Sequence, residues 1–329
     1  HRNAWDATLS VMDSLRAAGH IALLAGGCVR DRLLGRVPND YDVATNALPE
    51  RVRELFPRAR LVGAKFGVVL VHRFGHDIEV ATLRSDGTYL DGRRPDQVTF
   101  GDQREDALRR DFTINGLFYD PFAERVIDYV DGQADVQAHV IRTIGDPDIR
   151  FAEDHLRMLR AVRLSARLGF PIDPQTAAAI SRLSVNLRAI SPERIWMELE
   201  QILTEPTRGE GWRLLNALGL RANLSFEWPI DPLADSLGGE RLHALPLESV
   251  DAGLALAAAL PDSPLSQIEA ICRSFRLSNH LTDQVLWMKK SIEATHRAVS
   301  LELADFKPLR ASPYWPLLLE LLRTDLIAK

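Results

Sequence analysis

Two aspartates separated by one residue, Asp40 and Asp42, follow the adjacent glycines Gly26 and Gly27. Carboxylates at i and i+2 of an extended segment point to one face of a strand, where they can share divalent cations. Residues 23–31 are typical of a strand, a Gly-Gly turn and a helix, an arrangement that exposes backbone N–H groups to an anion. A phosphate site beside paired carboxylates is what metal-dependent nucleotidyl transfer requires. Taken alone, each feature is also typical of an ordinary solvated turn.

The elements that must position these residues change character near residue 144. Before it, strands are predicted over 21–25, 41–44, 68–72 and 77–83, with a hairpin over 114–129. After it, helices are predicted over 149–168, 176–183, 193–203 and 209–218, then an irregular stretch over 223–247 and further helices. The predicted fold class is therefore α+β, a head with a mixed sheet and helices followed by an all-helical part.

Composition limits the class of protein. A chain of 329 residues suggests about two or three domains. We expect a cytoplasmic protein without membrane spans, because no long apolar run or signal-peptide pattern occurs and Cys28 and Cys272 are too few for a disulfide framework. A net charge of −5 argues against non-specific nucleic-acid coating. A local excess of arginines could nevertheless contact RNA phosphates, at Arg160, Arg163, Arg167, Arg182 and Arg188.

Residues 24–45 resemble the active-site signature of the class II tRNA nucleotidyltransferase and bacterial poly(A) polymerase family, a branch of the polymerase-beta superfamily. Further blocks of the same family follow in order over 76–84, 87–100, 109–121, 150–170 and 191–203. The resemblance implies a nucleotidyltransferase head over 1–144, a base-selecting helical neck over 145–204 and an RNA-binding helical body over 205–329. The sequence leaves open whether a C-terminal tail is missing.

The resemblance implies a role for three carboxylates. Asp40 and Asp42 are the predicted metal ligands and, with Glu79, the predicted catalytic residues. Two Mg²⁺ ions would activate the attacking 3′-hydroxyl, orient the triphosphate and stabilise the leaving pyrophosphate. Magnesium keeps several waters, so few carboxylates suffice. As an alternative, Glu79 is an outward-facing strand residue or an ion-pair partner of Arg84.

The triphosphate is predicted to lie at the glycine turn. Gly26 and Gly27 would bind it through their backbone, and Arg30 through charge-assisted hydrogen bonds. The alternative for Arg30 is an ion pair with Asp31 or Asp42.

A second group is predicted to recognise the ribose. Arg110, Asp111 and Asn115 match the ribose-recognition block of the family. An enzyme that builds RNA needs a polar contact to the 2′-hydroxyl. The alternative is an exposed charged turn, which is a common use of an Arg-Arg-Asp sequence.

A third group is predicted to select the base. On one continuous helix, Glu153, Asp154, Arg157 and Arg160 would fall within about a third of the circumference. The family's corresponding block selects ATP and CTP by contacts to the base edge, as a carboxylate acceptor and a guanidinium donor can do. The alternative is a pair of helix salt bridges from Arg157 to Glu153 and Asp154.

The function that these residues imply is template-independent addition of CCA to tRNA 3′ ends from CTP and ATP. Addition of the terminal A alone, poly(A) synthesis and a catalytically inactive RNA-binding protein are the alternatives. Residues 84–98 resemble a flexible loop that two-C-adding relatives lack, and the mildly basic segment 63–67 favours tRNA over poly(A) synthesis. The oligomeric state is not readable from the sequence.

Overall fold

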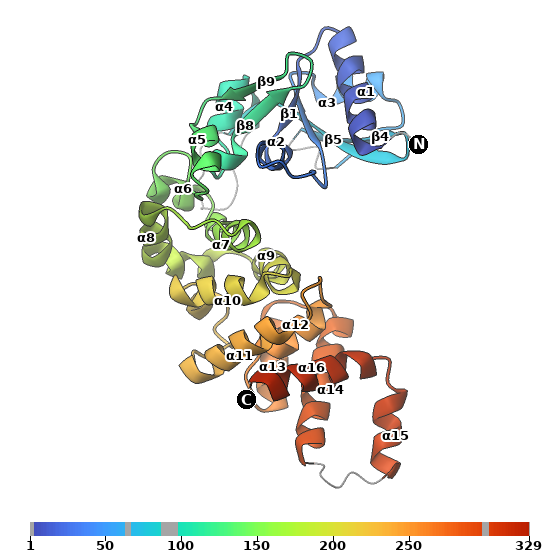
Figure 1. The fold of residues 1–329 in the computed structure, drawn as a ribbon, viewed down its shortest axis with the longest axis vertical. Helices are drawn as coiled ribbons and strands as arrows, with labels where there is room; N and C mark the ends of the chain where they lie inside the picture. The colour runs from blue at the N-terminus through green and yellow to red at the C-terminus, as the bar shows by residue number, and fades with distance from the viewer. Residues whose placement is uncertain (1–2, 63–66, 87–97, 298–302, 329) are drawn as a thin grey trace. The chain divides into compact units, whose positions relative to one another are not determined.

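The computed structural model describes residues 3–62, 67–86, 98–297 and 303–328 (Figure 1). Contacts divide the chain into a first unit, His1–Asp154 with Pro171–Thr176, and a second unit, His155–Phe170 with Ala177–Lys329. The finer division into head, neck and body stays a prediction. Among the described residues, no helix is long and apolar enough to cross a membrane.

The first unit is built on a mixed seven-stranded sheet of order β3-β4-β5-β2-β1-β8-β9. Its strands are β1 Ala22–Ala25, β2 Asp42–Thr45, β3 Arg60–Leu61, β4 Val68–Arg73, β5 His76–Thr82, β8 Leu117–Asp120 and β9 Arg125–Asp128. Only β2 and β5 run parallel to each other, and every other neighbouring pair is antiparallel. A separate two-stranded sheet joins β6 (Arg84–Asp86) to β7 (Val98–Phe100). The predicted mixed sheet is confirmed.

The first unit also contains six described α-helices, and the first three of them along the chain contact the strands of this sheet. The six are α1 Ala4–Ala17, α2 Gly27–Leu33, α3 Pro49–Leu55, α4 Gln103–Leu108, α5 Gly132–Gln137 and α6 Pro147–Glu153 (Figure 1). Helix α1 begins with a capping box between Asn3 and Asp6, and it buries Val11, Met12 and Leu15. All four residues of β1 are buried, which places this strand in the centre of the sheet.

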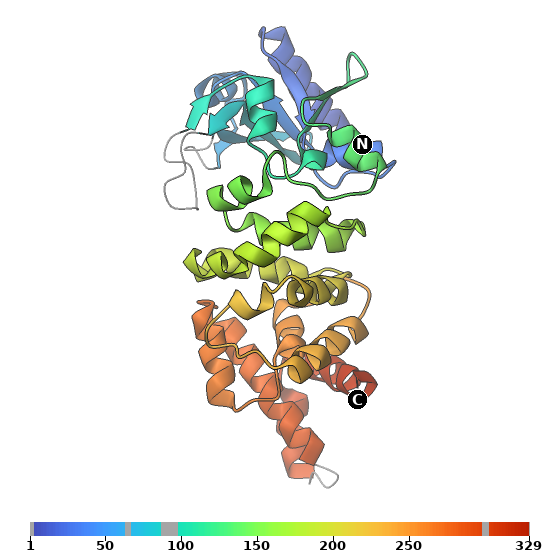
Figure 2. The ribbon, with the colours of Figure 1, turned by 90° about the vertical axis from the view of Figure 1, so that its left-hand side faces the viewer.

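The last described strand ends at Asp128, and the described elements after it are helices (Figures 1 and 2). After α6 they are α7 Arg157–Leu168, α8 Pro174–Leu183, α9 Pro192–Thr204, α10 Arg208–Ala217, α11 Pro232–Ala244, α12 Ala252–Ala259, α13 Leu265–Ser274, α14 Asn279–Arg297, α15 Leu303–Ala311 and α16 Trp315–Ala328. The prediction of an all-helical part after the α+β head is confirmed.

The predicted continuous helix over 149–168 is wrong. Helix α6 ends at Glu153, Asp154 has extended backbone angles (φ −147°, ψ 104°), and α7 begins only at Arg157. Aspartate is a weak former of helix interiors because its side chain competes for backbone hydrogen bonds. One continuous helix therefore does not carry the four residues Glu153, Asp154, Arg157 and Arg160.

The predicted irregular stretch over 223–247 is also wrong, because it contains α11. Asp231 caps this helix by accepting hydrogen bonds from two backbone N–H groups, and Pro232 occupies its first turn. Its two glycines are required by packing. A Cβ on Gly238 would lie 2.7 Å from the Ala259 carbonyl oxygen, and one on Gly239 would lie 3.0 Å from the Trp212 ring.

A buried ion pair fixes α16 to α11. Asp325 is 0% exposed and accepts a 2.8 Å hydrogen bond from Arg241 Nε. We predict that Asp325→Ala lowers the free energy of unfolding by about 3–5 kcal/mol, because it leaves a buried guanidinium undercompensated. The matched control is Glu320→Ala on the same helix, whose surface pair with Arg323 should contribute less than about 1 kcal/mol. Equal losses in urea denaturation would contradict this ranking.

Candidate functional site

The two strands that run parallel bring together two predicted carboxylates. In the register of β2 with β5, Asp42 lies directly opposite Glu79. Asp40 is exposed and precedes β2 by two residues. The prediction that Glu79 lies on a strand next to Asp42 is confirmed, while the catalytic roles of the three residues stay predictions.

The surroundings of Asp42 disfavour its charge. Burial, together with the negative charges of Glu79 and Asp40, raises the pKa of its carboxyl from the usual 3.8 to about 6, and the Arg110 guanidinium opposes this rise. Among the residues that the structure describes, none forms a hydrogen bond or ion pair with the side chain of Asp42 or Glu79. A cation at this place would remove the repulsion between the two carboxylates.

The donor set fits a hard cation only in part. Within the described ranges, no group of three or more His, Cys, Asp or Glu side chains is arranged to hold a metal. Mg²⁺ is usually bound by one or two carboxylates, with waters and substrate phosphates completing its shell. Asp42 and Glu79 are therefore suited to a metal ion whose remaining ligands are water and the phosphates of a nucleotide.

The glycine turn lies between β1 and α2. Gly26 has φ 74° and ψ −131°, backbone angles that are essentially restricted to glycine, and its N–H donates to the Leu117 carbonyl at 3.0 Å. A Cβ on Gly26 would lie 3.0 Å from Arg110 Nη1, and one on Gly27 would lie 3.5 Å from Arg30 Nη2. Two guanidinium groups thus line the turn.

Both guanidinium groups converge on Asn115. Arg30 is 4% exposed, and its Nη1 donates to Asn115 Oδ1 at 2.7 Å, while Arg110 Nη1 donates to the Asn115 backbone carbonyl at 3.2 Å. Arg30 also forms an ion pair with Asp31 at 2.7 Å, as its alternative role requires. Asp111 is buried and accepts a hydrogen bond from the N–H of Phe112 at 2.9 Å.

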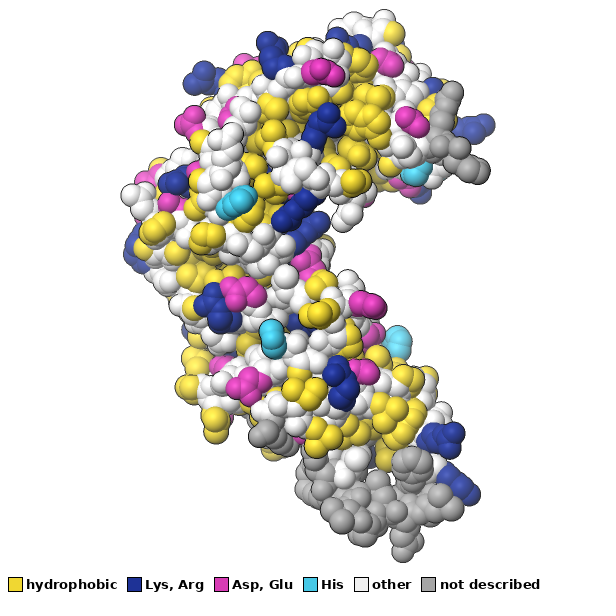
Figure 3. Space-filling model, in the orientation of Figure 1, with side chains coloured by type: hydrophobic (Ala, Val, Ile, Leu, Met, Phe, Trp, Pro, Cys, Tyr) yellow, Lys and Arg dark blue, Asp and Glu magenta, His cyan; other side chains and the backbone are white. Residues whose placement is uncertain are grey.

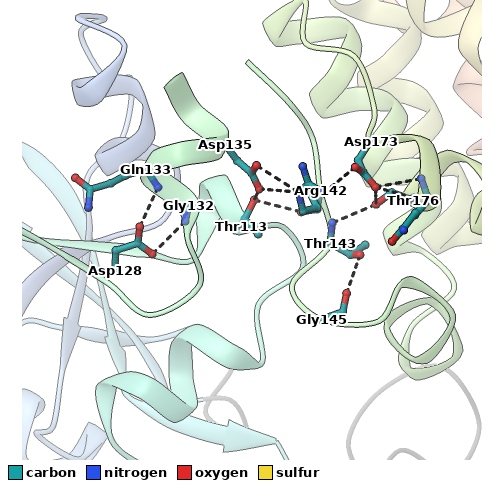
Figure 4. A network of polar contacts seen from close by, with 11 residues as sticks. Thr113, Asp128, Gly132, Gln133, Asp135, Arg142, Thr143, Gly145, Asp173 and Thr176 are labelled. Carbon is teal, nitrogen blue, oxygen red and sulfur yellow. Dashed lines mark hydrogen bonds and ion pairs between the residues drawn. The ribbon is translucent and has the colours of Figure 1, made fainter. Parts of the chain in front are cut away.

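A polar network holds the short helix η2 (Thr113–Asn115) that carries Asn115 (Figure 4). The Thr113 hydroxyl donates to Asp135 at 2.6 Å, and the Thr113 N–H donates to the Arg142 carbonyl at 3.0 Å. The Arg142 guanidinium pairs with Asp135 at 3.1 Å and with Asp173 at 2.8 Å. The network explains why residues 171–176 belong to the first unit, although they follow α7 in the sequence.

Two family models match this chain. The poly A polymerase head domain matches residues 22–142, and the probable RNA and SrmB-binding site of polymerase A matches residues 169–225. The CCA-adding enzyme of Geobacillus thermodenitrificans is 36% identical over 325 residues, which cover 94% of this chain and 79% of that protein. The chain belongs to the tRNA nucleotidyltransferase and poly(A) polymerase family.

Other relatives match over shorter stretches. Poly(A) polymerase I of Escherichia coli O157:H7 is 46% identical over 222 residues, which cover 63% of this chain and 47% of that protein. The match to the CCA-adding enzyme of Geobacillus stearothermophilus covers 54% of that enzyme, so the chain spans about half the length of these two curated relatives. The crystal structure of the Bacillus stearothermophilus CCA-adding enzyme in complex with CTP has a TM-score of 0.76 at 29% identity, covering 98% of this chain and 82% of that chain.

The predicted base-selecting residues of this family member are divided between the two units. Glu153 and Asp154 belong to the first unit, and Arg157 and Arg160 to the second. Glu153 pairs with Arg150 at 2.9 Å. The base-selecting role of the four residues therefore stays a prediction.

The arginine excess of the second unit is partly neutralised. Arg160 and Arg163 both face Glu198, at 3.8 Å and 2.8 Å. On the face drawn in Figure 3, the basic and acidic side chains of the described residues are interspersed. Segments 63–66 and 87–97, on which the choice between tRNA and poly(A) and the flexible-loop interpretation depend, lie outside the described residues.

A cavity of about 790 Å³ lies elsewhere, among α10, α11 and the end of α16. Its walls include Trp212, Ile230, His243 and Ile327, and none of the predicted site residues. The predicted site residues therefore lie outside this cavity.

One residue near the glycine turn was missed by sequence reasoning. Asp106 is buried in α4 and contacts both Arg109 and Arg110. Its spacing of three and four residues from these arginines is typical of helix ion pairs and would have indicated the contact.

The raised pKa of Asp42 gives a stability prediction. Ionisation costs the folded state free energy, so this penalty is absent well below pH 4 and complete above pH 6. In metal-free buffer at pH 7.5, Asp42→Asn should raise the free energy of unfolding by about 1–3 kcal/mol, and the gain should shrink as the pH falls from 6 to 4. Denaturant titrations at several pH values measure this. Asp13→Asn, at an exposed position on α1, is the control that should show no such pH-dependent gain.

The left-handed backbone of Gly26 gives a second prediction. Gly26→Ala should lower the free energy of unfolding by about 1–3 kcal/mol and weaken CTP binding, because the added Cβ meets both strain and Arg110 Nη1. Gly35→Ala is the matched control, since Gly35 also has positive φ (68°) but no atom within 4 Å of an added Cβ. Calorimetric titration with CTP should separate the two variants. Equal CTP affinity in both would contradict the link between the turn and Arg110.

Proposed function

We propose that this chain is a template-independent RNA nucleotidyltransferase that adds CCA to tRNA 3′ ends from CTP and ATP. The observation that carries the proposal is the in-register pair of Asp42 and Glu79 in the same unit as a glycine turn lined by two arginines. A tRNA substrate and nucleoside triphosphates are the proposed partners, and the cytoplasm is the proposed location.

Each group at the site has a chemical task in this proposal. Asp40 and Asp42 would hold Mg²⁺, with Glu79 beside them. When bound, Mg²⁺ supplies Lewis-acid activation of the 3′-hydroxyl and neutralises charge on the leaving pyrophosphate. Arg30 would stabilise the triphosphate oxygens at the glycine turn by charge-assisted hydrogen bonds. The sequence predicts a ribose contact for Arg110, but its guanidinium lies at Gly26, so we assign it to the triphosphate instead.

The remaining predicted residues would recognise the nucleoside. Asp111 and Asn115 follow Arg110 in the segment held by the polar network of Figure 4, and we assign them to the ribose. Glu153, Asp154, Arg157 and Arg160 would read the base, because a carboxylate acceptor and a guanidinium donor match the Watson–Crick edges of C and A.

Poly(A) synthesis is the second candidate. The 46% identity to a poly(A) polymerase favours it, but that match covers 63% of this chain, whereas the match to a CCA-adding enzyme covers 94%.

Addition of only the terminal A uses the same residues. A catalytically silent RNA-binding protein would have no use for a half-buried Asp42 placed opposite Glu79, a pair in which burial and the second carboxylate both raise the pKa of Asp42.

Extension of three transcripts tests the proposal: a tRNA lacking CCA, a tRNA ending in CC and an unstructured RNA, each with Mg²⁺ and CTP, ATP or both. We expect addition of three nucleotides to the first. Extension confined to the CC-ending tRNA would show an A-adding enzyme, and long tails on the unstructured RNA would show a poly(A) polymerase.

A variant of the carboxylate pair tests whether this chemistry resides at β2. Asp42→Ala should reduce extension by more than about 100-fold, while tRNA binding in a filter assay is retained. Loss of a residue that only orients a metal ligand costs about 10- to 100-fold, so a larger loss indicates a direct ligand. Asp77→Asn, two residues from Glu79 on β5 and exposed, is the control that should retain activity. Full activity of Asp42→Ala would exclude the proposed metal site.

A further inference from the structure

A single buried carboxylate holds two arginines at the end of α4. Asp106 is 2% exposed. Its Oδ1 accepts hydrogen bonds from Arg109 Nε at 2.9 Å and Nη2 at 2.6 Å, and its Oδ2 accepts from Arg110 Nε at 3.1 Å and Nη2 at 2.9 Å. Each oxygen of the carboxylate is therefore committed to one guanidinium group.

The carboxylate of this cluster is ionised. Burial alone would raise the pKa of Asp106, but Arg110 and Arg109 hold that pKa below its usual range. At neutral pH Asp106 is therefore charged and paired with both arginines. A buried charge of this kind is stable only when its partners stay in place.

The contact with Asp106 determines which edge of Arg110 faces the glycine turn. Nε and Nη2 are directed to Asp106, so Nη1 donates to the Asn115 carbonyl at 3.2 Å and lies 3.0 Å from the place of a Cβ on Gly26. The ring of Phe118 lies against the guanidinium, 5.2 Å from its carbon to the ring centroid. Three neighbours thereby fix the plane of this side chain.

Asp106 also holds the first residue of β6. Its Oδ1 accepts from the Arg84 N–H at 3.3 Å, and Arg109 Nε donates to the Arg84 carbonyl at 3.2 Å. Asp106 therefore has a structural task through Arg109 and a separate connection to the glycine turn through Arg110.

We infer that Asp106 is a positioning residue for the nucleoside triphosphate, acting through Arg110. It does not touch the substrate. It fixes the Arg110 guanidinium at the Gly26 turn, where the proposed function, on which this inference rests, places the triphosphate. An asparagine cannot replace it, because an amide has one acceptor oxygen and its NH₂ group would face the second guanidinium.

Equilibrium binding of CTP and ATP, measured by calorimetry, tests the inference without requiring turnover. Asp106→Asn should weaken both nucleotides roughly 10- to 100-fold, the loss expected for one or two charge-assisted hydrogen bonds. Its KM for tRNA should stay within about threefold of the wild-type value, the level of an uninvolved site. Glu105→Gln is the matched control: it removes an exposed carboxylate one residue earlier, and glutamine can still accept from the Asp102 N–H.

A double-mutant cycle with Arg110→Lys separates positioning from a structural role. Lysine keeps the charge but cannot contact Asp106 and Asn115 together. If Asp106 acts through Arg110, the double variant should bind CTP no more weakly than the weaker single variant. Additive losses, or unchanged nucleotide affinity in Asp106→Asn, would overturn the inference.

Two further outcomes are distinguishable. If Asp106→Asn does not fold, a double variant with Arg109→Gln restores the net charge of the cluster. This double variant should also bind CTP more weakly than the wild type. Wild-type CTP affinity in the double variant would overturn the inference. If the wild-type protein binds CTP in an Asp106-dependent way but extends none of the three transcripts, the proposed function fails while the inference stands.

Discussion

Burial of one aspartate beside a second carboxylate dominates the electrostatics of this site. The register of β2 and β5 places Asp42 opposite Glu79, and these two strands are the parallel pair in a sheet whose other neighbours are antiparallel. Partial burial makes the charge on Asp42 costly, so the folded protein is poised to gain from a cation at this place. In the proposed function, stability and catalysis make opposite demands on Asp42.

The arginines near this pair are each held by a carboxylate of their own. Asp31 pairs with Arg30 and Asp106 with Arg110, and both guanidinium groups then meet at Asn115. Because these carboxylates hold the arginines in place, the positive charge needs little reorganisation when an anion arrives. Such an arrangement allows a nucleotide to be recognised by its triphosphate while its base is read by other residues.

Sequence reasoning found the features that depend on local patterns. Short apolar runs bounded by turn residues predicted the strands, and the glycine pair predicted the turn at Gly26, whose φ of 74° requires glycine. The neighbouring strand of Glu79 was also predicted, but its exact register with Asp42 follows from sheet pairing that one sequence does not contain. The break at Asp154 was missed because the apolar pattern continues across a residue of low helix propensity. The helix after Asp231 was missed because its glycines and proline are typical of irregular segments, whereas a cap at Asp231 begins it.

The apparent pKa of Asp42 tests the central claim most directly, measured by carbon NMR of ¹³C-labelled aspartate carboxyls and assigned with Asp42→Asn. In metal-free buffer, the account predicts a pKa of about 6. Addition of Mg²⁺ and CTP should bring it well below that value, because a bound cation favours the ionised form. A pKa near 4 in metal-free buffer, or one that Mg²⁺ and CTP leave unchanged, would contradict the account of a carboxylate pair poised to bind metal.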